Sequence, residues 1–276
     1  MYGVLLAGGT GSRLWPHTIT HNKHTLPVYD MPMIFHPLRN LIRAGIRDVV
    51  VVTGGEHYGQ IKYILDTIEI DERSKRLLKL HDSLNLRYRL QDKPAGIADA
   101  LALADWIVRG QPVAVMLADN VFEDDEVLAD AVNGFRNGAH IFLKELPEEA
   151  IYEQGKDGKS RAKYGMAKVK DSTVVEIIEK PAPEKLPSKY AVTGAYLYDN
   201  TVFRIARTLT PSGRGELEIT DVNNEYIKTG NIKYSTVEGW WGDAGESVDG
   251  WLAVNNLAEK KCKNQQKSSI DGIIQH

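Results

Sequence analysis

Three glycines and two basic residues near the N-terminus form a pattern that suits the binding of an anion. An apolar run over residues 4–7 predicts a buried strand, and it leads directly into a glycine-rich turn containing Gly8, Gly9 and Gly11. Because glycine has no Cβ, successive backbone N–H groups can turn toward one anion at such a place. Arg13 follows at once and Lys23 lies ten residues further on. Together these groups could hold a polyphosphate, since backbone donors fix its oxygen positions and the cations offset its charge.

The spacing of this turn argues against two common phosphate-binding loops. A Walker loop ends in Gly-Lys-Ser/Thr, whereas Gly11 is followed by Ser12 and Arg13. A dinucleotide fingerprint opens a helix with its third glycine, and Pro16 disfavours a long helix here. An NAD-dependent oxidoreductase is therefore disfavoured. A glycine turn after a strand is by itself a weak signal, because many are only tight connections.

The whole stretch resembles the signature of the sugar-1-phosphate nucleotidylyltransferases, Leu-Ala-Gly-Gly-x-Gly-x-Arg-Leu followed by a Lys in a Lys-x-x-Leu-Pro context. The residues around Lys23, Asn-Lys-His-x-Leu-Pro-Val-Tyr-Asp-x-Pro-Met-Ile, resemble the glucose-1-phosphate thymidylyltransferase branch, with Met31 where that branch usually has Lys. The resemblance covers most of the chain. It implies that a hexose 1-phosphate, most simply glucose 1-phosphate, is joined to dTTP to give a dTDP-sugar and pyrophosphate.

The resemblance also implies roles for individual residues. Arg13 and Lys23 would grip the triphosphate, and Lys180, in Glu-Lys-Pro, would contact the sugar phosphate, so these three are the candidate catalytic residues. The nucleotide-binding candidates are Leu6, Ala7, Gly8, Gly9, Thr10, Gly11, Ser12, Gln91, Pro94 and Gly96. The sugar-phosphate-binding candidates are Asn120, Gly165, Glu179, Lys180, Thr193, Gly194, Tyr196, Arg214 and Trp241. By themselves most of the latter are ordinary strand residues, and we expect Glu218 and Thr220 to serve the local fold.

Two aspartates are the candidate metal ligands. Asp119 follows an apolar run over 113–117, and ligands of open parallel sheets bind beyond the carboxyl ends of strands. Asp243 lies in a Trp-Gly-Asp-Ala-Gly segment that resembles the family's Trp-x-Asp-x-Gly. Two carboxylates, phosphate oxygens and water would form the oxygen shell that Mg²⁺ prefers, and the resemblance implies that ion. Either residue alone could be a solvated turn residue, and Ala118 stands where the family usually has Gly.

The base preference stays open between dTTP and UTP. Gln91 and the following Pro-Ala-Gly-Ile-Ala turn resemble the family's Gln-x-x-Pro-x-Gly-Leu-Ala. An amide can donate and accept at the imide edge of either base. Thymine and uracil differ by one methyl group, which is worth about 1–3 kcal/mol of discrimination at most. A UTP-dependent uridylyltransferase is therefore the near alternative, and a non-catalytic nucleotide-sugar binding protein is the alternative from another class.

Composition bounds the class of protein. The 276 residues are 42% hydrophobic and 26% charged, with a net charge of −3, which is typical of a globular protein and gives no bulk reason to bind nucleic acid or an anionic membrane. One cysteine, Cys262, fits a reducing compartment. We see no signal peptide and no apolar run near the roughly 20 residues that span a bilayer, so we expect a cytoplasmic protein. The resemblance implies a homo-oligomer. His21 and His24 flank Lys23, but with no cysteine nearby we do not expect a zinc site.

The first half of the chain alternates strand and helix patterns, which predicts a mainly parallel sheet with helices on both faces. We expect strands over 4–7, 49–52, 84–90, 112–117 and 139–143, and helices over 32–44, 97–108 and 125–135. In the second half we expect a hairpin over 164–170 and 173–179, strands over 190–198 and 232–237, and helices over 201–209, 217–229 and 247–263. The fold class is therefore α/β, Rossmann-like and, by resemblance, of the nucleotide-diphospho-sugar transferase type.

We expect one domain over 1–276, with a mainly nucleotide-binding half (1–145) and a mainly sugar-binding half with a β subregion (146–276). Segments 67–82 and 148–163 are longer and more charged than the family's connections, and we interpret both as solvated insertions outside the active site. The C-terminal end is short beside the long thymidylyltransferases, whose extra helices build an allosteric nucleotide site. That difference argues against feedback control.

Overall fold

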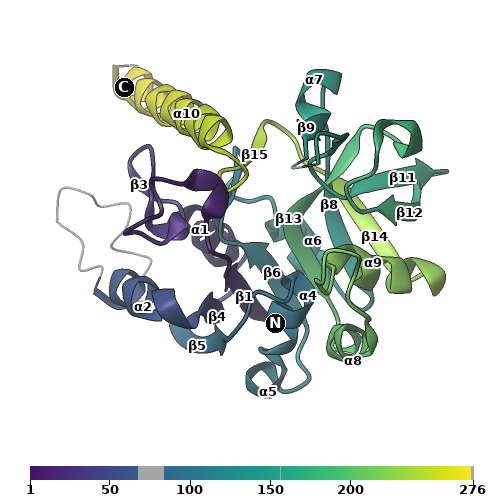
Figure 1. The fold of residues 1–276 in the computed structure, drawn as a ribbon. Coiled ribbons are helices and arrows are strands. Elements are labelled where there is room, and N and C mark those ends of the chain that lie inside the picture. Colours follow the sequence, from purple (N-terminus) through teal and green to yellow (C-terminus); the bar gives the residue numbers. More distant parts are fainter. Residues whose placement is uncertain (68–83, 156, 275–276) are drawn as a thin grey trace.

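The computed structural model describes residues 1–67, 84–155 and 157–274, and a nine-stranded mixed sheet lies at its centre (Figure 1). Four strands run parallel side by side, in the order β6 (Val113–Leu117), β1 (Tyr2–Ala7), β4 (Asp48–Gly54) and β5 (Asn85–Gln91). The remaining strands are β8 (Ala139–Glu145), β11 (Met166–Lys170), β12 (Thr173–Ile178), β13 (Tyr190–Tyr198) and β14 (Ile232–Thr236). Strand β13 pairs antiparallel with β6, β8 and β11, while β14 pairs parallel with β8, and so the second half of the chain makes the sheet mixed.

Alternate residues of the parallel strands face two separate cores, as their continuous apolar runs predict. Val4 and Leu6 of β1 face one core, while Leu5 and Ala7 face the other. The first core is covered by α4 (Ile97–Ala102), α5 (Asp105–Val108), α8 (Thr201–Thr208) and α9 (Ile219–Lys228). The second is covered by α1 (Phe35–Arg43), α2 (Tyr58–Thr67) and α6 (Ala129–Gly134). The predicted parallel sheet with helices on both faces is confirmed.

The three helices predicted in the first half of the chain differ from the observed ones. The helix expected over 97–108 is two short helices, because the chain tightens at Ala104, whose N–H bonds to the carbonyl of Leu101 at 3.0 Å. Helix α1 begins three residues later than expected, since Pro32 lies in a short strand. Helix α6 is also shorter than the predicted 125–135.

The hairpin between β11 and β12 has the expected turn. Asp171 and Ser172 both adopt left-handed backbone, with φ of 48° and 57°. Positive φ at both central residues is characteristic of the type I′ turn that matches strand twist, even though Asp-Ser is not a strong pair for it.

Three two-stranded ribbons and several short helices complete the described chain. The ribbons are β2 (Pro27–Val28) with β3 (Met31–Pro32), β7 (Asn120–Phe122) with β15 (Trp241–Asp243), and β9 (Tyr152–Gln154) with β10 (Ser160–Ala162). The short helices are η1 (Ser12–Leu14), η2 (Lys23–Thr25), η3 (Gly55–His57), η5 (Pro183–Lys185) and α7 (Glu148–Ile151).

The prediction that 148–163 is a solvated insertion is wrong. The segment forms α7 and the β9–β10 ribbon, and its Ile151 and Ala162 side chains are fully buried in the second core. Its many charges concealed these apolar anchors. The other segment treated as an insertion, 67–82, lies outside the described residues apart from Thr67, which ends α2.

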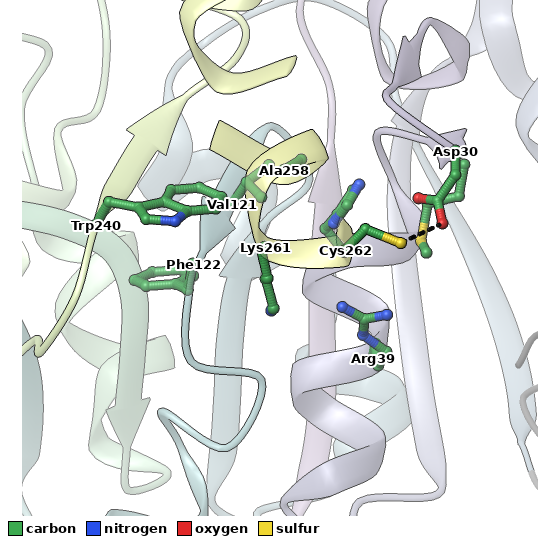
Figure 2. Close-up of a pocket in the computed structure, with 10 residues that line it drawn as sticks. Asp30, Arg39, Val121, Phe122, Trp240, Ala258, Lys261 and Cys262 are labelled. Carbon is green, nitrogen blue, oxygen red and sulfur yellow. Dashed lines mark hydrogen bonds between the residues drawn. The ribbon is translucent and has the colours of Figure 1, made fainter. Parts of the chain in front are cut away.

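Helix α10 (Val248–Ile274) runs further than the predicted 247–263 and packs against β2 and β15 (Figure 1). A small cavity of about 20 Å³ lies beside this helix, and Figure 2 shows Arg39 of α1 and Lys261 of α10 at its edge. Both side chains donate to Asp125 Oδ1, each at 2.7 Å, and Cys262 Sγ contacts Asp30 Oδ2 at 3.8 Å. None of the helices in the described part of the chain is long and apolar enough to cross a membrane.

Candidate active site

The β7–β15 ribbon brings the two candidate metal carboxylates together. Asp119 comes directly between β6 and β7, and Asn120 of β7 is the register partner of Asp243 of β15. The N–H of Ala244 donates to the Asp119 carbonyl at 2.8 Å, which extends the pairing by one step. Residues that are distant in sequence thus share one site at the carboxyl end of a central parallel strand, where open sheets bind their ligands.

Lys23 joins this pair. Its ammonium donates to Asp119 Oδ2, and both side chains are largely buried. Burial alone would lower the pKa of Lys23, but the carboxylates of Asp119 and Asp243 outweigh it and raise the pKa. Burial alone would raise the pKa of Asp119, and the Lys23 ammonium holds it below its usual range. Lys23 and Asp119 are therefore both charged at neutral pH.

Asp243 carries an unfavourable charge that a cation would relieve. Desolvation in the site and the neighbouring Asp119 carboxylate raise the pKa of Asp243 to about 7. Its Oδ1 accepts a bond from the Gly245 N–H at 2.8 Å. Within the described ranges no group of three acidic, histidine or cysteine side chains is arranged to hold a metal ion. The two carboxylates fit an ion such as Mg²⁺, which commonly binds one or two carboxylates and completes its shell with phosphate oxygens and water.

The Asn120 side chain ties three strands to this centre. Its Oδ1 accepts from the Gly194 N–H of β13 and from the Trp241 indole N–H of β15, both at 2.8 Å, and its Nδ2 donates to Asp119 Oδ1 at 3.1 Å. A Cβ on Gly194 would lie only 2.5–2.7 Å from the Asn120 amide atoms, so glycine is required for this close approach. We assigned Asn120 to the sugar phosphate by resemblance, and the structure adds this connecting role.

A cavity of about 250 Å³ lies between the glycine loop and the two aspartates. The predicted residues that line it are Leu6, Gly8, Gly9, Lys23, Gln91, Pro94, Gly96, Asp119 and Asp243. Four predicted nucleotide-binding residues do not line it, namely Ala7, which is buried in the second core, and Thr10, Gly11 and Ser12, which lie further along the loop. Sequence reasoning missed His24 and Glu216 as lining residues. The position of His24 beside Lys23 was the available signal, whereas Glu216 gave none.

Gln91 presents an acceptor to this cavity. Its Nε2 donates to Asp99 Oδ2 at 2.7 Å and to the Gly96 carbonyl at 3.3 Å. Both N–H groups are thus used inside the protein, and Oε1, which faces Gly8, is left to accept a bond from a ligand. We expected this amide both to donate to and to accept from the base; in this arrangement it could only accept, because both of its N–H groups are already used.

A second cavity, of about 220 Å³, lies on the other side of Asp243 and shares Ile97, Leu117 and Glu216 with the first. Every predicted sugar-phosphate residue lines it, as do Arg13 and Asp243, together with Lys163 and Tyr164, which sequence reasoning missed. The lining set that we predicted is Asn120, Gly165, Glu179, Lys180, Thr193, Gly194, Tyr196, Arg214 and Trp241.

The cations of the second cavity differ in how strongly they are already paired. Arg214 contacts three carboxylates, Glu218 at 2.8 Å, Glu179 at 3.1 Å and Glu216 at 3.8 Å. Arg13 has no carboxylate within 4.0 Å among the residues that the structure describes, so its charge is available to a ligand. Glu218 and Thr220, which we expected to serve the local fold, also line this cavity, and Thr220 donates to Glu179 at 2.6 Å.

Comparisons with known proteins agree with this geometry. A family model described as nucleotidyl transferase matches residues 2–260. A glucose-1-phosphate thymidylyltransferase of Actinoplanes sp. is 36% identical over 259 residues, which are 92% of this chain and 77% of that protein. A Bacillus anthracis protein provisionally described as a glucose-1-phosphate thymidylyltransferase, solved in complex with a sucrose, is 38% identical with a TM-score of 0.77 over 94% of this chain and 95% of that one. A UDP-glucose pyrophosphorylase solved with UDP-glucose has a TM-score of 0.81 at 25% identity, over 95% of this chain and 100% of that one.

Proposed function

This chain belongs to the nucleotidyl transferase family, and we propose that it joins glucose 1-phosphate to dTTP, giving dTDP-glucose and pyrophosphate. The observation that carries this proposal is the meeting of two cavities at Asp243, one with a phosphate-suited glycine loop and Asp119, and one lined by Lys180 and Arg13. Two anionic substrates could enter from opposite sides and react where the cavities join. The names of the relatives support the choice of thymidylyl transfer.

The reaction needs no side-chain nucleophile. A phosphate oxygen of the sugar phosphate forms a bond to the α-phosphorus of dTTP, and the bond from that phosphorus to the bridging oxygen of the β-phosphate breaks, so pyrophosphate leaves with the electron pair. The protein has to bring two anions together, align the attacking and leaving oxygens, and offset the charge. We assign Lys23 to the triphosphate, Lys180 to the incoming phosphate, and Arg13 to the region between them.

We propose that Asp119 and Asp243 hold Mg²⁺. When bound, this ion supplies charge neutralisation at the reacting phosphates and orients their oxygens. Asn120 supports the arrangement by fixing the direction of the Asp119 carboxylate, and the Lys23 ammonium keeps that carboxylate ionised. Burial and the neighbouring Asp119 carboxylate raise the pKa of Asp243, and binding of a dication would offset both effects.

The base-binding proposal leaves UTP as the second candidate nucleotide. Gln91 Oε1 could accept a bond from the imide N–H that thymine and uracil share. The structural likeness to a UDP-glucose pyrophosphorylase favours keeping this candidate. The selection between the two bases would depend on contacts with a single methyl group, worth about 1–3 kcal/mol.

The experiment is a measurement of pyrophosphate release from a panel of hexose 1-phosphates crossed with dTTP and UTP. We expect the highest kcat/KM with dTTP and glucose 1-phosphate. Lys23→Ala should reduce kcat by about 10²–10³-fold with saturating substrates, since it removes a preorganised charge at the triphosphate. A higher kcat/KM with UTP than with dTTP would instead support uridylyl transfer. Release of no pyrophosphate from any pair, or full turnover of Lys23→Ala, would refute it.

A further inference from the structure

The β9–β10 ribbon places an acidic side chain against Lys180, one of the cations that line the second cavity. Glu153, in the middle of β9, approaches the Lys180 ammonium through Oε1 at 3.4 Å. Lys180 is 16% exposed and Glu153 is 23% exposed, so water screens this pair only in part. None of the roles assigned above uses Glu153.

The ribbon is fixed to the chain beside Lys180. The N–H of Ala162, in β10, donates to the carbonyl of Pro181 at 2.8 Å, and Ala162 is the register partner of Tyr152. Glu153 follows Tyr152 in β9. Through Ala162, its partner in β10, Tyr152 is connected to Pro181, the residue after Lys180. The backbone thus holds the segments of Glu153 and Lys180 next to each other, and their side chains make the contact.

Lys180 itself adopts an uncommon backbone conformation. Its φ of 42° lies in the left-handed region, which costs a non-glycine residue about 1 kcal/mol or more. Lys180 lies two residues beyond the end of β12, and its side chain lines the second cavity. A flexible four-carbon chain would still let the ammonium move, unless a partner holds it.

A second contact connects Glu153 to the segment that carries Asp243. The carboxyl groups of Glu153 and Glu246 are close enough to affect each other's pKa, and Glu246 follows three residues after Asp243. Burial and the neighbouring Glu153 carboxyl raise the pKa of Glu246. Ser247 Oγ donates to Glu246 Oε2 at 3.2 Å, which fixes the far end of the chain of contacts.

We propose that Glu153 is a positioning residue for Lys180, which directs the ammonium toward the phosphate of the bound hexose 1-phosphate. This inference rests on the proposed function. An ammonium has three N–H donors, so one can stay on Glu153 while two remain for phosphate oxygens. The same carboxylate lies near an incoming dianion and weakens its binding. Glu153 thus favours turnover and opposes affinity at once.

The test separates these two effects by steady-state kinetics. Glu153→Gln keeps an oxygen that accepts from Lys180 and removes the charge, so KM for the hexose 1-phosphate should fall about threefold, with kcat unchanged. Glu153→Ala also removes the acceptor, so kcat should fall about tenfold, because a misdirected binding group aligns the substrate poorly. KM for the nucleoside triphosphate should not change in either variant.

Two controls distinguish positioning from a structural role. Asp157→Asn removes the Arg161–Asp157 ion pair from the same ribbon, at a site away from Lys180, and should leave all kinetic constants unchanged. In a Lys180→Ala background, Glu153→Ala should have no further effect on kcat. Thermal unfolding should show the same melting temperature for the Glu153 variants and the wild type.

Three results would overturn the inference while leaving the proposed function intact. They are an unchanged kcat in Glu153→Ala, an equal shift of KM for both substrates, or persistence of the kcat defect in the Lys180→Ala background. A wild-type protein without pyrophosphate release would instead overturn the proposed function, and this inference with it.

Discussion

Gly194→Ala tests whether the Asn120 amide holds the centre of the site together. The backbone at Gly194 is not in the left-handed region, so the new methyl group acts through space and not through backbone strain. It would lie 2.5–2.7 Å from three atoms of the Asn120 amide, which is 2% exposed and cannot move into solvent without leaving its partners. Asn120 must therefore shift, and its three hydrogen bonds must lengthen or break.

The magnitude follows from those contacts. Overpacking a tight site typically costs about 1–3 kcal/mol. Leaving the buried Trp241 N–H without an acceptor costs about 1–3 kcal/mol as well. Because the same movement of Asn120 causes both effects, we do not add them in full and expect the unfolding free energy to fall by about 2–4 kcal/mol. This lowers the melting temperature by roughly 4–16 °C for a protein of this size. Turnover should fall about 10–100-fold, because the Asp119 carboxylate loses the partner that orients it.

The assays are denaturant unfolding and pyrophosphate release. Gly59→Ala is the matched control, because no atom lies within 4 Å of the added methyl group and the residue is in helix α2. That variant should gain up to about 1 kcal/mol from helix propensity and keep its turnover. If Gly194→Ala were as stable and as active as the wild type, the assigned role of Asn120 would be wrong.

Three further predictions concern the metal, the pH dependence of stability and helix α10. Chelation by EDTA should abolish turnover, added Mg²⁺ should restore it, and the melting temperature should not respond to the chelator; turnover that survives chelation would contradict the metal proposal. Burial and the nearby Arg39 lower the pKa of His36 to about 4 from an ordinary value of 6.5. The unfolded chain therefore binds a proton that the native protein does not between these values, so the unfolding free energy should drop by about 3 kcal/mol from pH 6.5 to 4, and urea titrations of His36→Gln should show a shallower pH dependence than the wild type. Lys261→Met should lower the unfolding free energy by about 1 kcal/mol, because Asp125 is still paired with Arg39. An Asp125→Asn variant that lowers the unfolding free energy by no more than this would argue against the three-residue contact at α10.

The sequence indicated the parallel half of the fold well because its signals are local. The Val49–Val52 run and the apolar residues before Asp119 are continuous, as strands buried on both faces must be. The carboxyl ends of such strands meet at one edge of the sheet, and so the sequence alone placed Asp119 and the glycine loop at the same edge. The sugar-side residues came from the resemblance, and all of them line one cavity.

Other features depend on contacts between distant segments and leave no periodic trace. Strands β7 and β15 have three residues each, too few for any periodicity, yet they decide where Asp243 lies. The partners of Asn120 come from two other strands, so no local pattern reveals them. We predicted that the ribbon that carries Glu153 is solvated because its composition is polar. Composition alone cannot show that one of its side chains contacts Lys180.

Strand β13 limits how an experimenter could dissect this protein. It fills the space between β6 and β8, with Tyr198 opposite both Val113 and Ala139. A polypeptide ended at residue 145 would lose it and expose the backbone groups of two long strands, a ready template for pairing with other chains. We therefore expect truncated forms to aggregate, and any split reporter or chimaera assembled from this chain should keep β13 together with its three partner strands, β6, β8 and β11.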